Sequence, residues 1–152
     1  MREREALACA MSMSGAYLLP SAHRDAMNYT PDSSRRARAI EVWAALRSLG
    51  RSGLAELVSR NCRQAQHIAN GLREAGVEIL NEVVLNQVVV AFGDDEFTRR
   101  VIARVQDAGT CWCGGTSWRG RAAMRISVSS WATTAEDVER TIGAILEAQR
   151  AA

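Results

Sequence analysis

The chain has 152 residues, among them nineteen arginines and not one lysine. Without a side-chain amine it cannot form a Schiff base with a carbonyl compound, and it has no lysine for a phosphate-binding loop. A coding sequence rich in G and C also favours arginine over lysine. The absence therefore excludes several kinds of chemistry without indicating a purpose.

Metal ligands and long apolar runs are scarce as well. The two histidines and four cysteines include no C-x-x-C pair, so we predict no metal site and reduced thiols in a cytoplasmic protein. No apolar run approaches the ~20 residues of a membrane-spanning helix, and we expect no membrane partner. The net charge of +2, from 19 basic and 17 acidic residues spread along the chain, argues against a nucleic-acid partner.

The chain does have enough hydrophobic residues, 47%, to bury one core. Apolar residues at three- and four-residue spacing predict helices over residues 33–50 and 53–76, and β-branched runs predict strands over residues 77–80 and 83–92. The remaining elements are a helix between Gly93 and Gly109, strands over residues 110–118 and 122–129, and a last helix opened by a capping box of Thr133 and Glu136.

This order of elements predicts an α+β fold, with an antiparallel four-stranded sheet and helices packed on one face. We expect three parts. Residues 1–32 form an extended connecting segment with a short N-terminal helix, residues 33–76 form linking helices, and residues 77–152 form a small α/β sandwich domain.

Alternation along the last strand places Arg125 on the polar face of the sheet, together with Ser127 and Ser129. There its planar guanidinium could bind a carboxylate through two parallel hydrogen bonds, or it could pair with a neighbouring acidic side chain. At the start of the first long helix, Ser34 and its arginine neighbours suit a phosphate or carboxylate, or simply cap a helix with a solvated basic face.

Cys111 and Cys113 could form a reactive thiol pair, but nothing nearby in the sequence indicates a lowered pKa, so buried small hydrophobic residues are the favoured reading. His67 is read as a solvated histidine on the outer face of its helix. No Ser/His/Asp set, glycine-rich nucleotide loop or distinctive carboxylate pair is present, so we predict no catalytic residue in this chain.

Three separated segments together resemble the group II pyridoxal-phosphate-dependent decarboxylases, a family that includes the aromatic amino acid, histidine and glutamate decarboxylases. The likeness covers roughly residues 4–149. It is carried by residues 29–50 (YTPDSSRRARAIEVWAALRSLG), 80–88 (LNEVVLNQV) and 124–134 (MRISVSSWATT).

The resemblance implies the C-terminal small domain of a fold-type I enzyme, together with its linking helices. In this family the cofactor acts as an electron sink for loss of carbon dioxide. The resemblance places the lysine that holds it in a preceding large domain, with a histidine on the pyridine ring and an aspartate on its nitrogen. All three would lie upstream of Met1.

The resemblance gives two residues substrate-facing roles. Arg125 matches the arginine that contacts a substrate carboxylate in glutamate decarboxylases, and Ser34 matches a position that lines the neighbouring subunit's pocket and influences substrate choice. The expectation is therefore a truncated amino-acid decarboxylase, inactive alone, that does not bind pyridoxal phosphate covalently and pairs as a homodimer or with the missing large domain. The alternative is a non-catalytic oligomerisation or interaction module derived from that enzyme.

Overall fold

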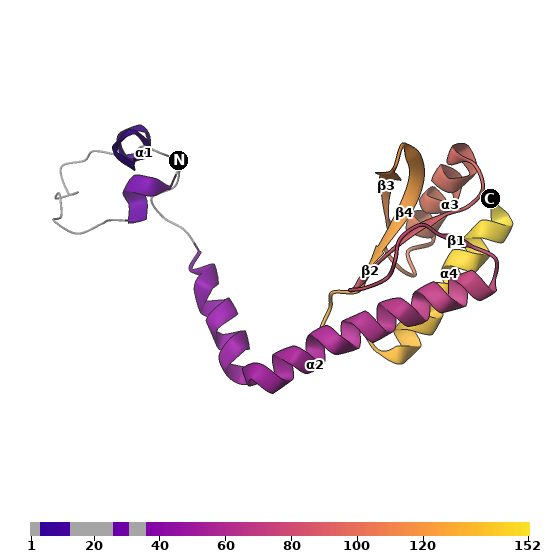
Figure 1. The fold of residues 1–152 in the computed structure, drawn as a ribbon, viewed down its shortest axis with the longest axis horizontal. Coiled ribbons are helices and arrows are strands. Elements are labelled where there is room, and N and C mark those ends of the chain that lie inside the picture. Colours follow the sequence, from indigo (N-terminus) through magenta and orange to yellow (C-terminus); the bar gives the residue numbers. More distant parts are fainter. Residues whose placement is uncertain (1–3, 13–25, 31–35) are drawn as a thin grey trace. The chain divides into compact units, whose positions relative to one another are not determined.

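The computed structural model describes residues 4–12, 26–30 and 36–152 (Figure 1). The chain divides into two compact units, Met1–Ser48 and Leu49–Ala152. The first unit contains helix α1 (Arg4–Met11) and the short 3-10 helix η1 (Ala26–Tyr29). Within the described residues, no helix is both long and apolar enough to span a membrane. The expected three-part division at residues 32 and 76 stays a prediction.

Helix α2 (Arg38–Glu74) is interrupted at Gly50, where φ is 62° and ψ is −172°. A positive φ is easily adopted only by glycine, so the predicted end of the first helix at this residue is where the helical path breaks. The following segment lies in the second unit and supplies one side of its core. Its buried residues are Asn61, Ala65, Ile68, Ala69 and Leu72.

The four strands form one antiparallel sheet in the order β1-β2-β4-β3, and the helices of the second unit cover one of its faces (Figure 1). This confirms the predicted α+β class. The strands are β1 (Glu78–Ile79), β2 (Gln87–Ala91), β3 (Gly114–Trp118) and β4 (Arg121–Ser127), and the covering helices after α2 are α3 (Asp95–Ala108) and α4 (Ala135–Ala151).

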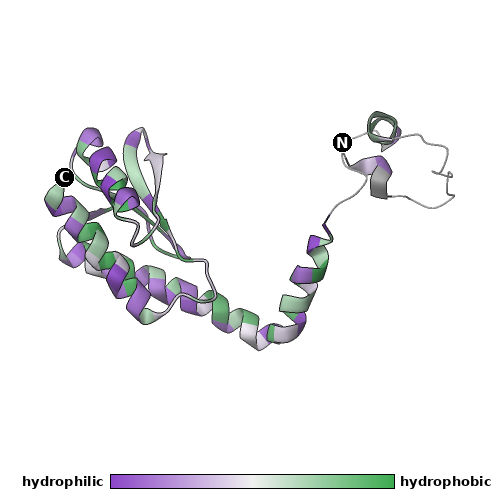
Figure 2. Ribbon diagram, turned by 180° about the vertical axis from the view of Figure 1, so that it is seen from behind, coloured by the Kyte–Doolittle hydropathy of each residue, from purple (hydrophilic) through white to green (hydrophobic). Residues whose placement is uncertain are grey.

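The register of β2 against β4 explains where the core lies. Val88 is opposite Ile126 and Val90 is opposite Met124, and all four side chains are buried in the core that the helices cover. Because side chains alternate along a strand, the residues between them face away from the helices. Figure 2 shows hydrophobic and hydrophilic residues alternating along the helices of the second unit, and in α4 the buried ones are Val138, Ile142, Ile145 and Ala148.

The predicted strand over residues 83–92 is shorter in the structure, because β2 begins only at Gln87. Val84 and Leu85 are 66% and 63% exposed. The side chain of Asn81 pairs with backbone here: its Oδ1 accepts a hydrogen bond from the Val89 amide at 2.8 Å, and its Nδ2 donates to the Gln87 carbonyl at 3.2 Å. β-branched composition alone did not reveal this irregular entry to the strand.

The capping box of α4 is one residue later than predicted. Thr134, not Thr133, is the N-cap, and its hydroxyl accepts from the Asp137 amide while Asp137 accepts from the Thr134 amide. These bonds from Thr134 lower the pKa of Asp137. Both Thr133 with Glu136 and Thr134 with Asp137 fit a box pattern, so spacing could not decide between them.

Two helical glycines test how α2 packs against α4. A Cβ at Gly71 would lie 2.9 Å from Ile142 Cδ1, whereas one at Gly143 would meet nothing within 4 Å. We predict that Gly143→Ala raises the free energy of unfolding by about 0.5–1 kcal/mol through helix propensity, and that Gly71→Ala loses that gain by displacing Ile142. Urea denaturation followed by circular dichroism measures both, and equal stabilisation by the two would contradict this packing.

Candidate functional site

Arg125 lies in the middle of β4, which is an inner strand of the sheet, and on the face away from the helices. Its neighbours in sequence, Met124 and Ile126, are 0% and 4% exposed, while Arg125 itself is exposed. The strand therefore holds the backbone of Arg125 firmly between two ladders and leaves its guanidinium in solvent. The predicted placement on the polar face is what the structure has.

Arg121 and Arg125 share this face but differ in their partners. Arg121 donates to both carboxylate oxygens of Glu78, at 3.0 and 2.7 Å, and this pairing lowers the pKa of Glu78. Among the residues that the structure describes, the guanidinium of Arg125 has no hydrogen-bond or ion-pair partner. Pairing with an acidic neighbour, one of the two readings from sequence, thus applies to Arg121 and not to Arg125.

The surroundings of Arg125 are open on one side. Opposite it on β3 is Gly114, around which an added Cβ would meet nothing within 4 Å, and opposite it on β2 is Val89, which is 6% exposed. Ser127 is the next residue on the same face of β4. An unpaired guanidinium beside a glycine and a hydroxyl can form two parallel hydrogen bonds to an incoming carboxylate.

Ser34, the other predicted site residue, lies outside the described residues. The nearest described residue of its cluster is Arg36, which lies just before α2 and forms an ion pair with Glu41 of that helix. Arg36 is thus already matched by an acid within its own segment. The role of Ser34 at a neighbouring subunit's pocket stays a prediction.

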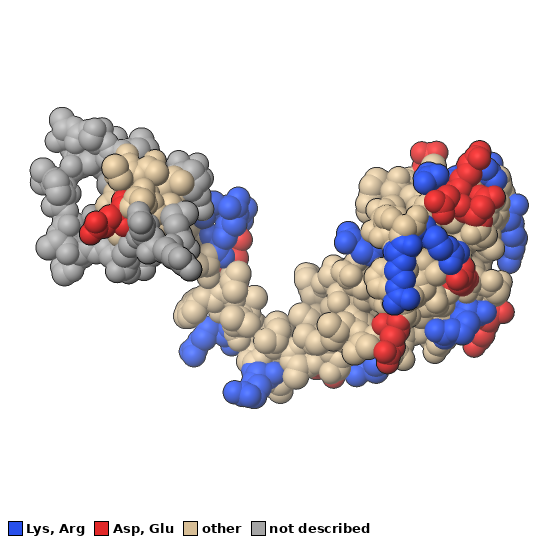
Figure 3. All heavy atoms as spheres, turned by 45° about the horizontal axis from the view of Figure 1, so that its top comes forward, with Lys and Arg blue, Asp and Glu red and all other residues tan. Residues whose placement is uncertain are grey.

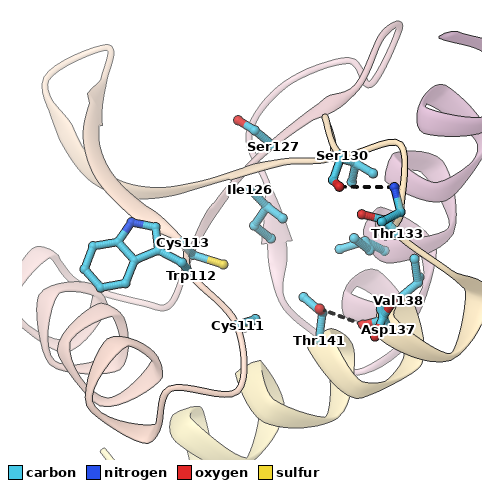
Figure 4. Close-up of a pocket in the computed structure, with 13 residues that line it drawn as sticks. Cys111, Trp112, Cys113, Ile126, Ser127, Ser130, Thr133, Asp137, Val138 and Thr141 are labelled. Carbon is cyan, nitrogen blue, oxygen red and sulfur yellow. Dashed lines mark hydrogen bonds between the residues drawn. The ribbon is translucent and has the colours of Figure 1, made fainter. Parts of the chain in front are cut away.

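A pocket of about 280 Å³ opens at the end of the sheet, between the segment before β3, the end of β4 and the start of α4 (Figure 4). Cys111 and Cys113 both line it. Cys113 is 1% exposed and belongs to the core, as a buried small residue should, but Cys111 is only partly buried. A hydrogen bond from the Cys113 thiol lowers the pKa of Cys111 to about 7, so the interpretation as a buried small hydrophobic residue fits Cys113 and not Cys111.

A wider pocket of about 590 Å³ lies between α2, the loop after β4 and the start of α4. Arg60 donates to the Trp131 carbonyl at 2.8 Å, and His67 Nε2 lies 2.6 Å from Glu139 Oε1. His67 is 58% exposed by its side chain, and the interaction with Glu139 is one that the reading of a solvated histidine did not foresee. These contacts hold α2 to the loop and to α4, although the buried Nε of Arg60 has no hydrogen-bond partner among the described residues.

Charged residues of both signs are interspersed over the second unit on the face that Figure 3 shows. Many arginines of the second unit form ion pairs. They include Arg63 with Glu56, Arg99 with Asp95, Arg100 with Glu96 and Arg121 with Glu78. Arg125 is distinguished from these arginines by lacking such a partner among the described residues.

Comparisons of the sequence with family models and with characterised proteins agree on one family. Residues 1–92 match the conserved domain of the pyridoxal-dependent decarboxylases. Histidine decarboxylase of Drosophila melanogaster is 33% identical over 116 residues, which are 75% of this chain and 14% of that protein. The 3,4-dihydroxyphenylacetaldehyde synthase of the same fly is 28% identical over 109 residues, 69% of this chain and 21% of that protein.

Solved structures share the fold. TDC of Oryza sativa, solved with PLP and tryptamine, superimposes with a TM-score of 0.78 at 17% identity, covering 95% of this chain and 33% of that one. Tryptophan decarboxylase of Catharanthus roseus, solved with L-tryptophan, gives a TM-score of 0.72 at 19% identity, covering 83% and 29%. The chain thus spans a third or less of the length of these relatives. Arg125 lies beyond residues 1–92, so the family match does not itself include it.

Proposed function

Because the chain belongs to the pyridoxal-dependent decarboxylase family, we propose that it is the sheet-bearing C-terminal part of a cytoplasmic amino-acid decarboxylase, in which Arg125 binds a carboxylate of the substrate. The substrates of such enzymes are amino acids, and each carries at least one carboxylate. A fixed guanidinium on the sheet would orient that group and set which amino acids are accepted.

The observation that carries this proposal is the contrast along β4. Arg121 is neutralised by Glu78 through two hydrogen bonds, whereas Arg125, four residues along the same face, has no partner among the described residues. Because the backbone of Arg125 is already fixed in an inner strand, binding a ligand would cost little additional backbone entropy. The glycine opposite Arg125 leaves room for that ligand.

The residues of this chain do not fit covalent attachment of the family's cofactor. Pyridoxal phosphate is the cofactor of the family, and it is held through a lysine, but the chain contains none. The proposal therefore assigns no catalytic step to these residues. It gives Arg125 a binding role, and it predicts no decarboxylation by this chain alone.

The proposed carboxylate site is tested by substitution of the two β4 arginines. The probe is glutarate, a dicarboxylate without an amine, titrated calorimetrically into the full chain at low ionic strength. We expect Arg125→Gln to weaken binding by about tenfold or more, since it removes a charge-assisted pair of hydrogen bonds. Arg121→Gln, which removes the same charge from the same face, should leave the affinity within about twofold.

Two results would count against the carboxylate site. Equal weakening by Arg121→Gln and Arg125→Gln would mean that glutarate responds only to net charge. Saturable binding of glutaramide, the neutral diamide, with the same affinity would mean that the carboxylate is not what is recognised.

A second candidate function rests on a different observation, the exposed apolar residues at the start of α2. Trp43 is 63% exposed and Leu46 is 48% exposed, one helical turn apart, and the same segment exposes other large hydrophobic side chains. They are Ile40, Val42 and Leu49. We propose that this surface pairs with a second copy of the chain, as in an oligomerisation module.

Sedimentation velocity tests this pairing over a range of protein concentrations. The wild-type chain should sediment as a dimer, and the double substitution Trp43→Arg with Leu46→Arg should give a monomer, because charges would have to be buried at the interface. Trp131→Arg is the control, since Trp131 is 78% exposed but lies in the other unit. A wild-type monomer at all concentrations, or equal effects of both changes, would refute the proposal.

A further inference from the structure

The segment that joins α3 to β3 brings two cysteines together outside the regular structure. The helix ends at Ala108 and the strand begins at Gly114, so Cys111 and Cys113 lie on neither element. The Cys113 carbonyl accepts a hydrogen bond from Gln106 Nε2 of α3 at 2.8 Å, which anchors the segment. Covalent change at the two sulfurs therefore requires no break in the sheet.

The two cysteines differ in their exposure to solvent. Cys111 is partly buried and Cys113 is 1% exposed, and both line the pocket of about 280 Å³. Figure 4 shows the Cys113 sulfur directed into this pocket and the Trp112 ring directed away from it. Cys111 is thus the more exposed residue of the pair, and both residues line the pocket that a small molecule would enter.

The two thiols differ in pKa. A hydrogen bond from Cys113 is the main cause that lowers the pKa of Cys111 to about 7, with burial opposing it and Thr141 assisting. The same contact, together with burial, raises the pKa of Cys113. Near neutral pH the negative charge thus resides on Cys111, the more exposed residue of the pair, and Cys113 keeps its proton.

The other groups around the pocket are mostly neutral. Among the described residues, Asp137 of α4 is the charged residue in the lining. Its carboxylate accepts hydrogen bonds from Thr134 and lies 3.9 Å from Arg140. Thr141 donates to the Asp137 carbonyl at 2.8 Å, so its single hydroxyl proton is shared between that carbonyl and the Cys111 sulfur. Cys113 is therefore the principal donor to Cys111.

We propose that Cys111 and Cys113 are a redox-responsive site, which a low-molecular-weight disulfide such as glutathione disulfide converts into an intramolecular disulfide. The Cys111 thiolate attacks one sulfur of the reagent. The reagent's sulfur–sulfur bond breaks, one reagent thiolate leaves and takes up a proton, and Cys111 becomes a mixed disulfide.

The second step closes the ring. Once the Cys111 sulfur is neutral, the charge that raised the pKa of Cys113 is gone and burial alone opposes its ionisation. Cys113 then loses its proton and attacks the Cys111 sulfur, and the second reagent thiolate leaves. In total the two protein thiols lose two electrons and two protons, and the reagent gains them as two thiols.

Mass mapping of the full chain after incubation with glutathione disulfide at pH 7.5 tests the proposal. In the wild type, the peptide that contains Cys111 and Cys113 should lose two hydrogens without gaining a glutathionyl group. Cys113→Ser should accumulate one glutathionyl group on Cys111, because the attacking thiol is present and the closing thiol is not. Cys62 is the internal control, since it is also partly buried but lines a different pocket.

A second measurement distinguishes a lowered pKa of Cys111 from mere solvent exposure of its thiol. The rate of iodoacetamide labelling at Cys111 should rise with a midpoint near pH 7 in the wild type, and Cys113→Ala should move the midpoint toward about 8.5, the value of an ordinary cysteine. A midpoint unchanged by Cys113→Ala, or a wild-type peptide that glutathione disulfide leaves fully reduced, would overturn the proposal. Neither result depends on the proposed carboxylate site.

Discussion

The alternation of side chains along β4 is the constraint on which the rest of this structure depends. Met124 and Ile126 lie beneath the helices, and this burial fixes the register against β2. A slip of one residue would place Arg125 in the core and expose the apolar pair, at a cost of several kcal/mol. The same constraint that holds the sheet together therefore holds Arg125 on the open face.

Hydrogen bonds fix the loop that connects β4 to α4. Asn86 Nδ2 donates to the Val128 carbonyl, and the Val128 amide donates to the Asn86 carbonyl, both at 2.9 Å. Further along the loop, Gln64 of α2 donates to the Thr133 carbonyl at 2.9 Å. Because the loop is held from both sides, the start of α4 and the thiol pocket beside it are positioned by hydrogen bonds to the loop backbone that do not involve Arg125.

How much the sequence could predict follows from the range of the interactions. Helix α3 and its caps, Asp94 and Gly109, depend on local contacts, and spacing predicted the helix correctly. The start of β2 could not be predicted, because the Asn81 side chain bonds to Val89 and Gln87, eight and six residues away. The fold class was nonetheless predictable, since hydrophobic periodicity and the order of the elements determine it.

For the candidate sites too, local patterns were predictable from the sequence, whereas contacts between distant residues were not. Alternation placed Arg125 on the correct face, but its lack of an acidic partner depends on which arginine Glu78 of β1 reaches, and only the folded sheet decides that. The C-x-C spacing was a visible signal, yet the lowered pKa of Cys111 depends on a hydrogen bond from the Cys113 thiol, which spacing alone does not reveal. The spacing of residues could not identify the family. The resemblance of three segments to the pyridoxal-phosphate-dependent decarboxylases did, and the family match confirms it.

The most direct measurement is a nitrogen-15 spectrum of the arginine Nε groups during titration with glutarate, in which the Arg125 signal is assigned by its loss in Arg125→Gln. The account predicts a saturable shift of Arg125 while the paired Arg121 signal stays in place. A shift of Arg121 alone, or parallel small shifts of all arginine signals, would contradict a carboxylate site at Arg125.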